Sequence, residues 1–182
     1  MTINNFLKLQ VVALLFAAIT SPLSALAGTN SKQATIEFSL GTYEVPGVKA
    51  ECAPSYYGST ITGIGTGSIT VNGKSESLGV LYLKANDCIT PLNSEFTRFS
   101  AEGNLTLTAG NKNTITAHYS TDFSQTDDPN DDPLIFEYKN FKLTITGGTG
   151  SFKGVSGSGT ADGMSHIGTG LGFVQGIINI SN

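Results

Sequence analysis

The sequence offers few side chains of the kinds that carry out acid–base or nucleophilic catalysis. Its two histidines are His118 and His166, and neither belongs to a recognisable catalytic motif. No serine lies in a G-x-S-x-G turn, the motif that exposes a nucleophilic serine in α/β-hydrolases. In a strand, His118 would share a face with Thr114 and Thr116, where it could line a polar cavity or meet solvent. The residues alone therefore identify no catalytic site.

An acidic segment, Asp127–Asp132, could supply carboxylate oxygens to a calcium ion. Its D-x-N-x-D spacing from Asp128 begins like an EF-hand loop. However, Pro133 stands at the sixth position, where that loop needs glycine, and Lys139 stands at the twelfth, where it needs glutamate. A solvated acidic turn is the ordinary alternative. We assign no metal and no cofactor to the chain from its sequence.

Two glycine-rich segments, residues 63–67 and 147–163, have the composition of phosphate-binding loops. A Walker loop places lysine directly after its last glycine, whereas Lys153 precedes Gly154. A dinucleotide-binding fingerprint needs a following helix within a βαβ unit, and no helical pattern follows either segment. Nucleotide binding is therefore excluded, and a structural role for these glycines is favoured.

Residues 1–27 have the three-part pattern of a secretory signal peptide: a cation, an apolar run over residues 9–19, and small residues before the cleavage site. The apolar run is shorter than the roughly 20 residues needed to span a membrane. We predict cleavage between Ala27 and Gly28. Residues 28–182 then form a single domain, secreted or periplasmic, with no integral membrane segment.

The charge of the chain bears on its partners. The formal net charge is −4, and Arg98 is the one arginine. A mildly acidic chain without a basic stripe has no electrostatic surface for nucleic acid or for an anionic membrane. The sequence does not indicate an oligomeric state.

Cys52 and Cys88 are the two cysteines of the chain. They form no C-x-x-C motif and have no neighbouring histidine, so they fit neither zinc ligation nor thiol exchange. An even number of cysteines in an exported protein favours a disulfide. We therefore predict a Cys52–Cys88 bridge, which would stabilise the fold by about 4 kcal/mol on the chain-entropy model.

Most of the mature sequence alternates apolar and polar residues with a period of two, which is typical of β-strands. The segment Gly110–Asn113 separates two such stretches and predicts a hairpin turn. About eight strands with short connections indicate an all-β antiparallel barrel or sandwich, and glycines within strands favour the barrel. The predicted strand segments are residues 33–40, 48–52, 59–71, 78–84, 104–109, 114–119, 134–138 running on into 141–146, 155–164 and 173–180.

The most distinctive stretch reads TGGTGSFKGVSGSGTADG, from Thr146 to Gly163. It resembles the T-G-G-T-G-x-F-x-G-x-x-G-x-G pattern of bacterial allene-oxide-cyclase-barrel-like proteins, and plant dirigent proteins carry a related motif. Shorter similarities over residues 60–109 (G-T-G, L-G, D-C-I and L-T-L-T-A) follow the order found in that exported bacterial group. The resemblance implies a calycin-like, eight-stranded barrel with a central cavity. The matching residues are Gly147, Gly148, Thr149, Gly150, Phe152, Gly154, Gly157 and Gly159.

This motif has a structural interpretation of its own. Its first three glycines would let the chain turn out of one strand, Phe152 would pack back onto the end of the barrel, and its last three glycines would bend the next strand. In the wider superfamily, allene oxide cyclases hold a lipid epoxide in an apolar barrel, and dirigent proteins orient radicals. The resemblance transfers no catalytic residue to this chain, so it concerns the scaffold.

Three functions fit this interpretation. The first is a non-catalytic barrel that binds a small apolar or amphipathic molecule, and the second is a cyclase or isomerase that acts by confinement. The third is a packed structural or surface-interaction barrel. A cavity of about 300 Å³ or more would favour the first two, and a buried carboxylate or His118 within it would favour the enzyme. A middle filled by Phe38, Tyr82, Phe136 and Phe141 would favour the third.

Overall fold

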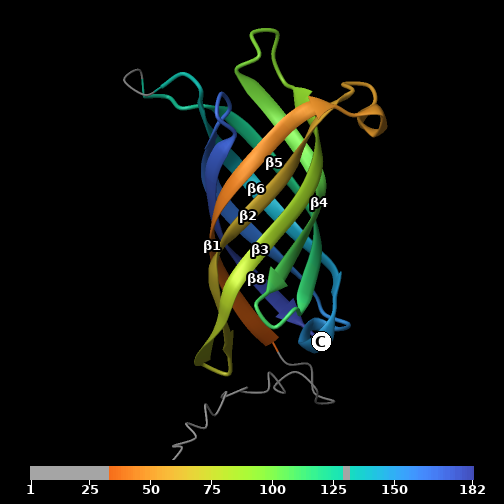
Figure 1. Cartoon of the computed structure of the whole chain (residues 1–182), viewed down its shortest axis with the longest axis vertical. Helices are drawn as coiled ribbons and strands as arrows, with labels where there is room; N and C mark the ends of the chain where they lie inside the picture. The colour runs from red at the N-terminus through yellow and green to blue at the C-terminus, as the bar shows by residue number, and fades with distance from the viewer. Residues whose placement is uncertain (1–32, 129–131) are drawn as a thin grey trace, which may run out of the picture.

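The computed structural model describes residues 33–128 and 132–182, which form a closed barrel of eight antiparallel strands (Figure 1). Each strand pairs with its neighbours in sequence, and β8 pairs with β1 to close the ring. This confirms the predicted all-β, eight-stranded antiparallel barrel. The strands are β1 (Gln33–Val48), β2 (Tyr57–Val71), β3 (Lys74–Pro91), β4 (Arg98–Ala109), β5 (Thr114–Gln125), β6 (Ile135–Gly148), β7 (Ser156–His166) and β8 (Leu171–Ser181).

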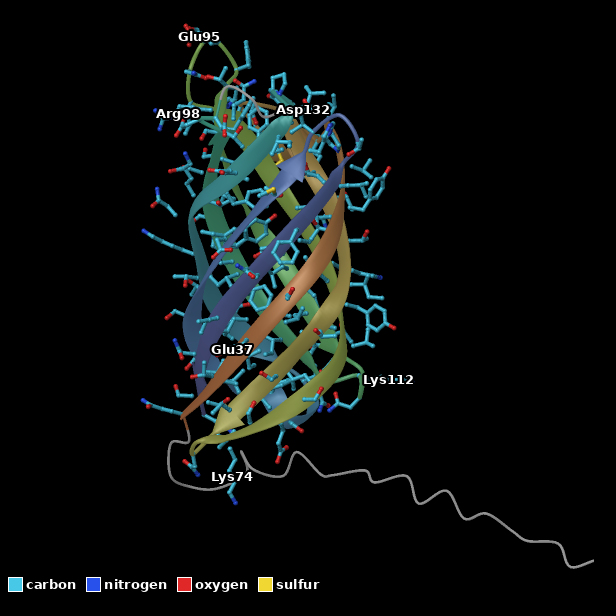
Figure 2. The ribbon with its side chains drawn as sticks, turned by 90° about the vertical axis from the view of Figure 1, so that its left-hand side faces the viewer. Glu37, Lys74, Glu95, Arg98, Lys112 and Asp132 are labelled. Atoms are coloured by element: carbon cyan, nitrogen blue, oxygen red, sulfur yellow. A yellow bond between two sulfur atoms is a disulfide. The ribbon has the colours of Figure 1, made fainter. Side chains whose placement is uncertain are left out.

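The period-two pattern of the sequence decides which side chains enter the barrel. In β5, every second residue is buried, from Ile115 through Tyr119 to Phe123. The residues between them face outward, because successive side chains of a strand point to opposite faces of the sheet. Charged residues such as Glu37 and Lys112 lie on the outer wall and at the turns (Figure 2).

The two ends of the barrel differ, and we name them by their contents. The aliphatic end holds the turns at residues 72–73 and 110–113 and the short helix η3 (Gly150–Phe152). Its interior is filled by buried aliphatic side chains such as Ile36, Ile115 and Ile178. The disulfide end holds the other connections, and its smaller apolar cluster contains Ile89, Ala101, Phe123 and Phe136.

The glycine motif forms the last turn of the aliphatic end. Gly150 has a φ of 60°, a left-handed conformation that favours glycine, and it opens η3. Phe152, 1% exposed, packs into the aliphatic core. In β7, a Cβ atom on Gly157 would collide with the backbone carbonyl of Asn179 on β8. The motif therefore permits a tight turn and a close approach of two strands.

The connection between β1 and β2 differs from the sequence prediction. The predicted strand over residues 48–52 is wrong, because β1 ends at Val48 and the 3₁₀ helix η2 (Ala50–Cys52) follows. The Tyr56 N–H donates a hydrogen bond of 2.8 Å to the Cys52 carbonyl, which folds this segment back on itself. The alternation of polar and apolar residues here belongs to a turn that covers the outside of the barrel.

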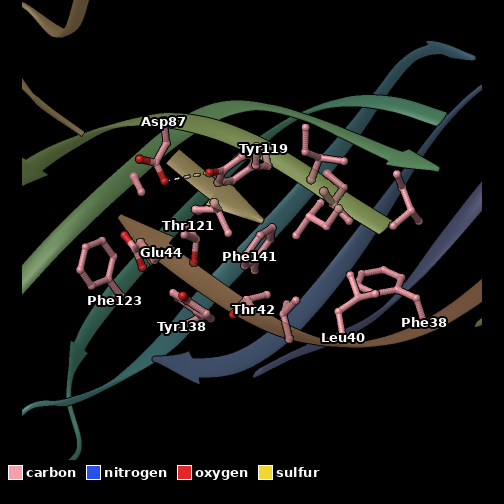
Figure 3. Close-up of a pocket in the computed structure, with 18 of the residues that line it drawn as sticks. Phe38, Leu40, Thr42, Glu44, Asp87, Tyr119, Thr121, Phe123, Tyr138 and Phe141 are labelled. Carbon is pink, nitrogen blue, oxygen red and sulfur yellow. Dashed lines mark hydrogen bonds between the residues drawn. The ribbon is translucent and has the colours of Figure 1, made fainter. Parts of the chain in front are cut away.

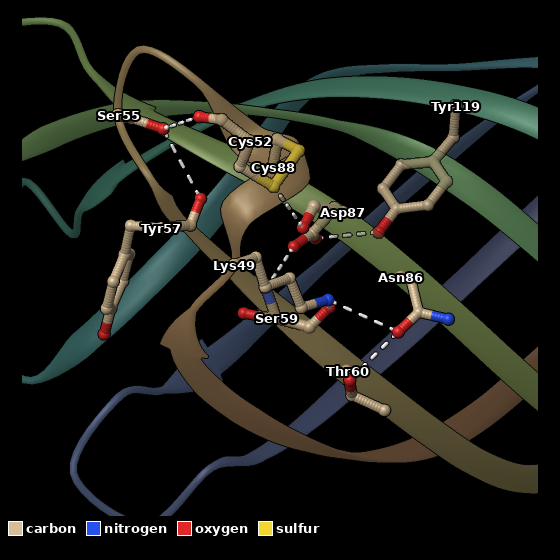
Figure 4. The surroundings of a disulfide bond; sticks show 10 residues. All are labelled: Lys49, Cys52, Ser55, Tyr57, Ser59, Thr60, Asn86, Asp87, Cys88 and Tyr119. Carbon is tan, nitrogen blue, oxygen red and sulfur yellow. Dashed lines mark hydrogen bonds between the residues drawn. A yellow bond between two sulfur atoms is a disulfide. The ribbon is translucent and has the colours of Figure 1, made fainter.

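The predicted disulfide is confirmed. Cys52 and Cys88 are joined with an S–S distance of 2.01 Å across a sequence separation of 36 residues. Cys88 points outward from β3, since the preceding residue, Asp87, is buried on the inner face. The bridge therefore fastens η2 to the outer wall of the barrel, immediately behind Asp87 (Figure 4).

The predicted signal peptide, residues 1–27 with cleavage between Ala27 and Gly28, lies outside the described residues. Within the two described ranges, no helix has the length and apolar character needed to cross a membrane. The barrel itself occupies the predicted mature part of the chain, from Gln33 to Ser181.

Candidate functional site

Two acidic side chains enter the barrel near its disulfide end (Figure 3). Asp87 on β3 follows the inward residues Leu83 and Ala85 at the same period of two, and it is 5% exposed. Glu44 on β1 follows the buried Leu40 in the same way and is mostly buried. The alternation that fills the core therefore also places two carboxyl groups inside it.

A hydrogen-bond network connects these two carboxyl groups through Ser59, which is fully buried on β2. The Ser59 N–H donates to Asp87 Oδ1 at 2.7 Å, and its hydroxyl donates to Glu44 Oε1. The Tyr119 hydroxyl donates to Asp87 Oδ2 at 2.8 Å (Figure 4). Asp87 is thus held by two donors, and Ser59 links it to Glu44.

Lys49 approaches this network from the β1–β2 connection. Its Nζ donates to the backbone carbonyl of Ser59 and, at 3.3 Å, to Asn86 Oδ1 (Figure 4). Lys49 does not line the cavity that Glu44 and Asp87 line. Lys49 therefore lies beside the site, and its charge acts on Asp87 from there.

Burial governs the protonation of this site. Burial raises the pKa of Glu44, and the nearby charge of Asp87 raises it further, while the hydrogen bond from Ser59 opposes the shift. Burial also raises the pKa of Asp87, against the hydrogen bonds from Tyr119 and Ser59 and the charge of Lys49. Both carboxyl groups consequently hold their protons to a higher pH than they would in water.

Aromatic rings form the wall beside the carboxyl groups. The Tyr119 and Phe141 rings stack with centroids 5.4 Å apart, and Tyr138 meets Phe141 edge-on at 5.9 Å. Phe123 continues the row at 6.4 Å from Tyr138. Burial raises the pKa of the Tyr119 and Tyr138 hydroxyls, so both phenols remain neutral. The two acids and the four rings line one cavity.

The cavity has a volume of about 60 Å³. Glu44 and Asp87 lie at one end of it, and Phe38 and Leu40 lie at the other (Figure 3). The space is large enough for a compact group and too small for a long-chain ligand unless the walls move. It is well below the roughly 300 Å³ at which typical small-molecule pockets begin.

Three of the four aromatic residues whose inward packing would favour the third function lie inside the barrel. Phe136 is fully buried, and Phe38 and Phe141 pack against the larger core. Tyr82 is not inside: it is 50% exposed on the outer face of β3, since Leu81 and Leu83 occupy the inner face. Tyr82 therefore does not contribute to the packing of the interior.

The histidines lie away from the cavity. His118 is on the outer wall, where its Nε2 is 3.0 Å from Glu102 Oε1, so the alternative of a cavity-lining His118 is wrong. His166 Nε2 lies 3.3 Å from Asp132 Oδ2 at the disulfide end. Residues 129–131 of the acidic segment lie outside the described residues. In the ranges 33–128 and 132–182, no group of three acidic, histidine or cysteine side chains is placed to hold a metal.

None of the residues of this network was predicted from the sequence to form a site. The available signal was the inward face of each strand: Asp87 is four residues after Leu83, and Glu44 is four residues after Leu40. Asp87 also belongs to the D-C-I segment that carried part of the family resemblance. That segment lies in β3, which continues to Pro91, beyond the predicted end of the strand at residue 84.

No protein-family model matches the chain, and no curated protein matches it. Among solved structures, the barrel is similar to the pterocarpan synthase dirigent protein, with a TM-score of 0.44 and 17% sequence identity. The match covers 92% of this chain and 98% of that chain. A likeness of this size concerns the fold alone, and the bacterial and exported parts of the family resemblance stay predictions.

Proposed function

We propose that the barrel binds a small molecule in its interior, with the polar group of that molecule against Glu44 and Asp87. The observation that carries the proposal is the presence of two acidic side chains in a cavity otherwise lined by apolar and neutral residues. Burial of a carboxyl group destabilises a fold unless something compensates for the lost hydration. A purely structural barrel would be more stable with apolar residues at both positions.

The small cavity supports the packed-barrel alternative, and it also limits what the site could bind. About 60 Å³ fits a compact group without movement of the walls. A larger ligand needs the side chains at the disulfide end, such as Phe123, to move aside. The apolar lining favours a hydrocarbon part, and the hydroxyl and carboxyl groups favour a polar part. An amphipathic ligand satisfies both.

A second function, acid–base catalysis by confinement, is favoured by one specific observation. Glu44 has a raised pKa, and it shares Ser59 with Asp87, which receives two hydrogen bonds. Such a pair can hold one proton on Glu44 and leave Asp87 as a carboxylate. Glu44 would then donate the proton and Asp87 would stabilise positive charge, a division of roles that suits isomerisation or cyclisation.

We further infer that the protein works outside the cytoplasm, secreted or periplasmic. The Cys52–Cys88 disulfide supports this location, because such bonds persist in oxidising compartments. The signal-peptide pattern of residues 1–27 supports it independently. N-terminal sequencing of the protein recovered from its own compartment should begin at Gly28, and an uncleaved chain in the cytoplasm would contradict the inference.

Native mass spectrometry of the protein purified from its own compartment tests the binding function. We expect a co-purifying small molecule in the native protein and in a Glu102→Gln variant, whose altered side chain lies on the outer wall. The Glu44→Gln and Asp87→Asn variants should lose it. Repeated absence of any bound molecule from the native protein would contradict the proposal. Chemical conversion of the recovered molecule by fresh protein would select the enzyme over the binder.

A further inference from the structure

We propose that the polar group recognised by this cavity is a compact organic cation, such as a short alkylammonium. The inference rests on the proposed binding function and names the class of ligand. The ammonium group would lie against Glu44 and Asp87, and its alkyl part would lie against the aromatic and aliphatic wall. Three features of the cavity lead to this assignment: its charge, its rings and its size.

The charge of the cavity is unbalanced. Among the described residues that line it, Glu44 and Asp87 are the two with carboxyl groups, and none is cationic. The charge of Lys49 lowers the pKa of Asp87, but its Nζ forms hydrogen bonds with the Ser59 carbonyl and Asn86 beside the cavity. A bound cation would supply the missing positive charge and form charge-assisted hydrogen bonds with the carboxylates, whereas an anion would be repelled.

The rings beside the acids favour the same charge. The faces of aromatic rings carry partial negative charge and attract an ammonium group within about 6 Å of the ring centre. Tyr119, Phe123, Tyr138 and Phe141 form a continuous row along the cavity that also contains both acids. Carboxylates and aromatic faces together recognise an organic cation better than they recognise a neutral alcohol of the same shape.

The size of the cavity limits the cation. A volume of about 60 Å³ favours a compact ligand over a long-chain one. Isopropylammonium is a compact organic cation, and 2-propanol has nearly the same shape without the charge. This pair of probes therefore isolates the contribution of the positive charge to binding.

Binding of a cation must be coupled to release of protons. Glu44 shares its surroundings with Asp87 on β3, Tyr119 on β5, Tyr138 on β6 and, through the Ser59 carbonyl, Lys49. Burial raises the pKa of both acids in the empty protein, whereas a bound cation favours their ionised forms. Affinity for the cation should rise as the pH increases through the raised pKa values of Glu44 and Asp87.

The test is an NMR titration of the intact, disulfide-bonded protein with isopropylammonium and, separately, with 2-propanol. At pH 8 we expect the cation to bind about tenfold more tightly than the alcohol, with shifts at the cavity residues. Acidification should reduce this ratio toward one. The Glu44→Gln variant should reduce it at pH 8, and the matched Glu102→Gln variant on the outer wall should not.

The remaining outcomes separate the two proposals. Binding of 2-propanol as tightly as isopropylammonium would overturn the assignment of a cation and leave the small-molecule function in place. Binding of neither probe to the folded protein would overturn the assignment, and an additional absence of any co-purifying molecule would overturn the function. An unchanged preference in Glu44→Gln, which retains the Ser59 hydrogen-bond acceptor, would show that the cation binds elsewhere and would also overturn the assignment.

Discussion

The two ends of the barrel are built from the same eight strands with the same alternation, but their interiors differ in chemistry. At the aliphatic end, inward positions carry residues such as Ile36, Ile115 and Ile178, whose burial stabilises the fold. Toward the disulfide end, the inward positions after Leu40 and Leu83 lead to Glu44 and Asp87. The difference shows that one periodic pattern can build a stabilising core and, a few residues farther along, an interior that is costly for stability.

The disulfide lies at the end with the less stabilising interior. Cys52 and Cys88 fasten η2 to the outside of β3, directly behind Asp87. The bridge acts on the unfolded chain by restricting its conformations, so it stabilises the fold without filling the cavity. We therefore regard the aliphatic end as stabilised from within and the disulfide end as stabilised from outside. This contrast between the two ends predicts the outcome of four measurements.

The largest effect is expected for Phe152→Ala at the aliphatic end. Phe152 is 1% exposed, and its removal should leave a cavity that destabilises the protein by about 3–5 kcal/mol. The matched control is Phe96→Ala at the disulfide end, where the side chain is 63% exposed, with an expected change within about 0.5 kcal/mol. Urea denaturation measures both. Equal losses would contradict the idea that the aliphatic end supplies the core stability.

The next effect is expected for removal of the bridge by the double change Cys52→Ser and Cys88→Ser. The free energy of unfolding should fall by about 2–4 kcal/mol. The bridge joins residues 36 positions apart, and without it the unfolded chain regains the conformations that this link excludes. Hydrogen exchange should show faster opening of η2 than of β7. Uniform acceleration across the barrel would mean that the bridge does not act mainly at its own end.

Asp87→Asn should destabilise the protein by about 1–3 kcal/mol. An asparagine keeps one acceptor oxygen, but its amide group cannot accept the second of the hydrogen bonds from Ser59 and Tyr119. Asp162→Asn, on the exposed face of β7, is the control and should change stability little. Chemical denaturation of both variants gives the comparison. A neutral effect of Asp87→Asn would show that the network contributes little to the disulfide end.

The smallest effect is expected for Glu44→Gln, which should stabilise the protein at pH 8 by on the order of 1 kcal/mol. Burial raises the pKa of Glu44 above its ordinary value of 4.5, so the folded state binds its proton more tightly than the unfolded state does. The resulting stability is present below pH 4.5 and is lost as the pH rises through the raised pKa. Burial also raises the pKa of Asp87, so this residue likewise lowers the stability of the protein as the pH rises.

Thermal unfolding of the native protein and of Glu44→Gln between pH 4 and 8 tests this sign. The melting temperature of the native protein should fall more steeply toward pH 8 than that of the variant. Glu102→Gln, at the exposed ion pair with His118, should keep the native slope. If the melting temperature of Glu44→Gln falls toward pH 8 as steeply as that of the native protein, the Glu44 side chain is hydrated in the folded protein.

Local patterns were sufficient to predict the barrel, the bridge and the hairpin at Gly110–Asn113. They failed for segments whose conformation depends on contacts with residues that are distant in the sequence. The segment over residues 48–52 alternates like a strand, but the bond from Cys52 to Cys88 and the return of the chain at Tyr56 make it a turn. The predicted strand segment over residues 78–84 ended before Asp87, so the inward position of that residue was missed.

The site was harder to predict than the fold, because its members are neighbours only after the barrel closes. Glu44, Ser59, Asp87 and Tyr119 come from four different strands. Each looks ordinary in its own segment: a serine or an acid in a strand is usually solvated. The ladders of the barrel bring them together, and burial then changes their acidity. The two histidines, which the sequence singled out as candidates for chemistry, lie outside the cavity instead.

The closing ladder of the barrel has a consequence for the order of folding. Seven of the eight ladders join strands that are adjacent in the sequence and can form as hairpins. The eighth joins the two ends of the barrel sequence, with Gln33 opposite Ser181 and Tyr43 opposite Leu171. Loop-closure entropy disfavours this contact until the intervening hairpins have shortened the path between its partners. The ladder next to Glu44 should therefore form last, and the acidic cavity should be completed only in the final step of folding.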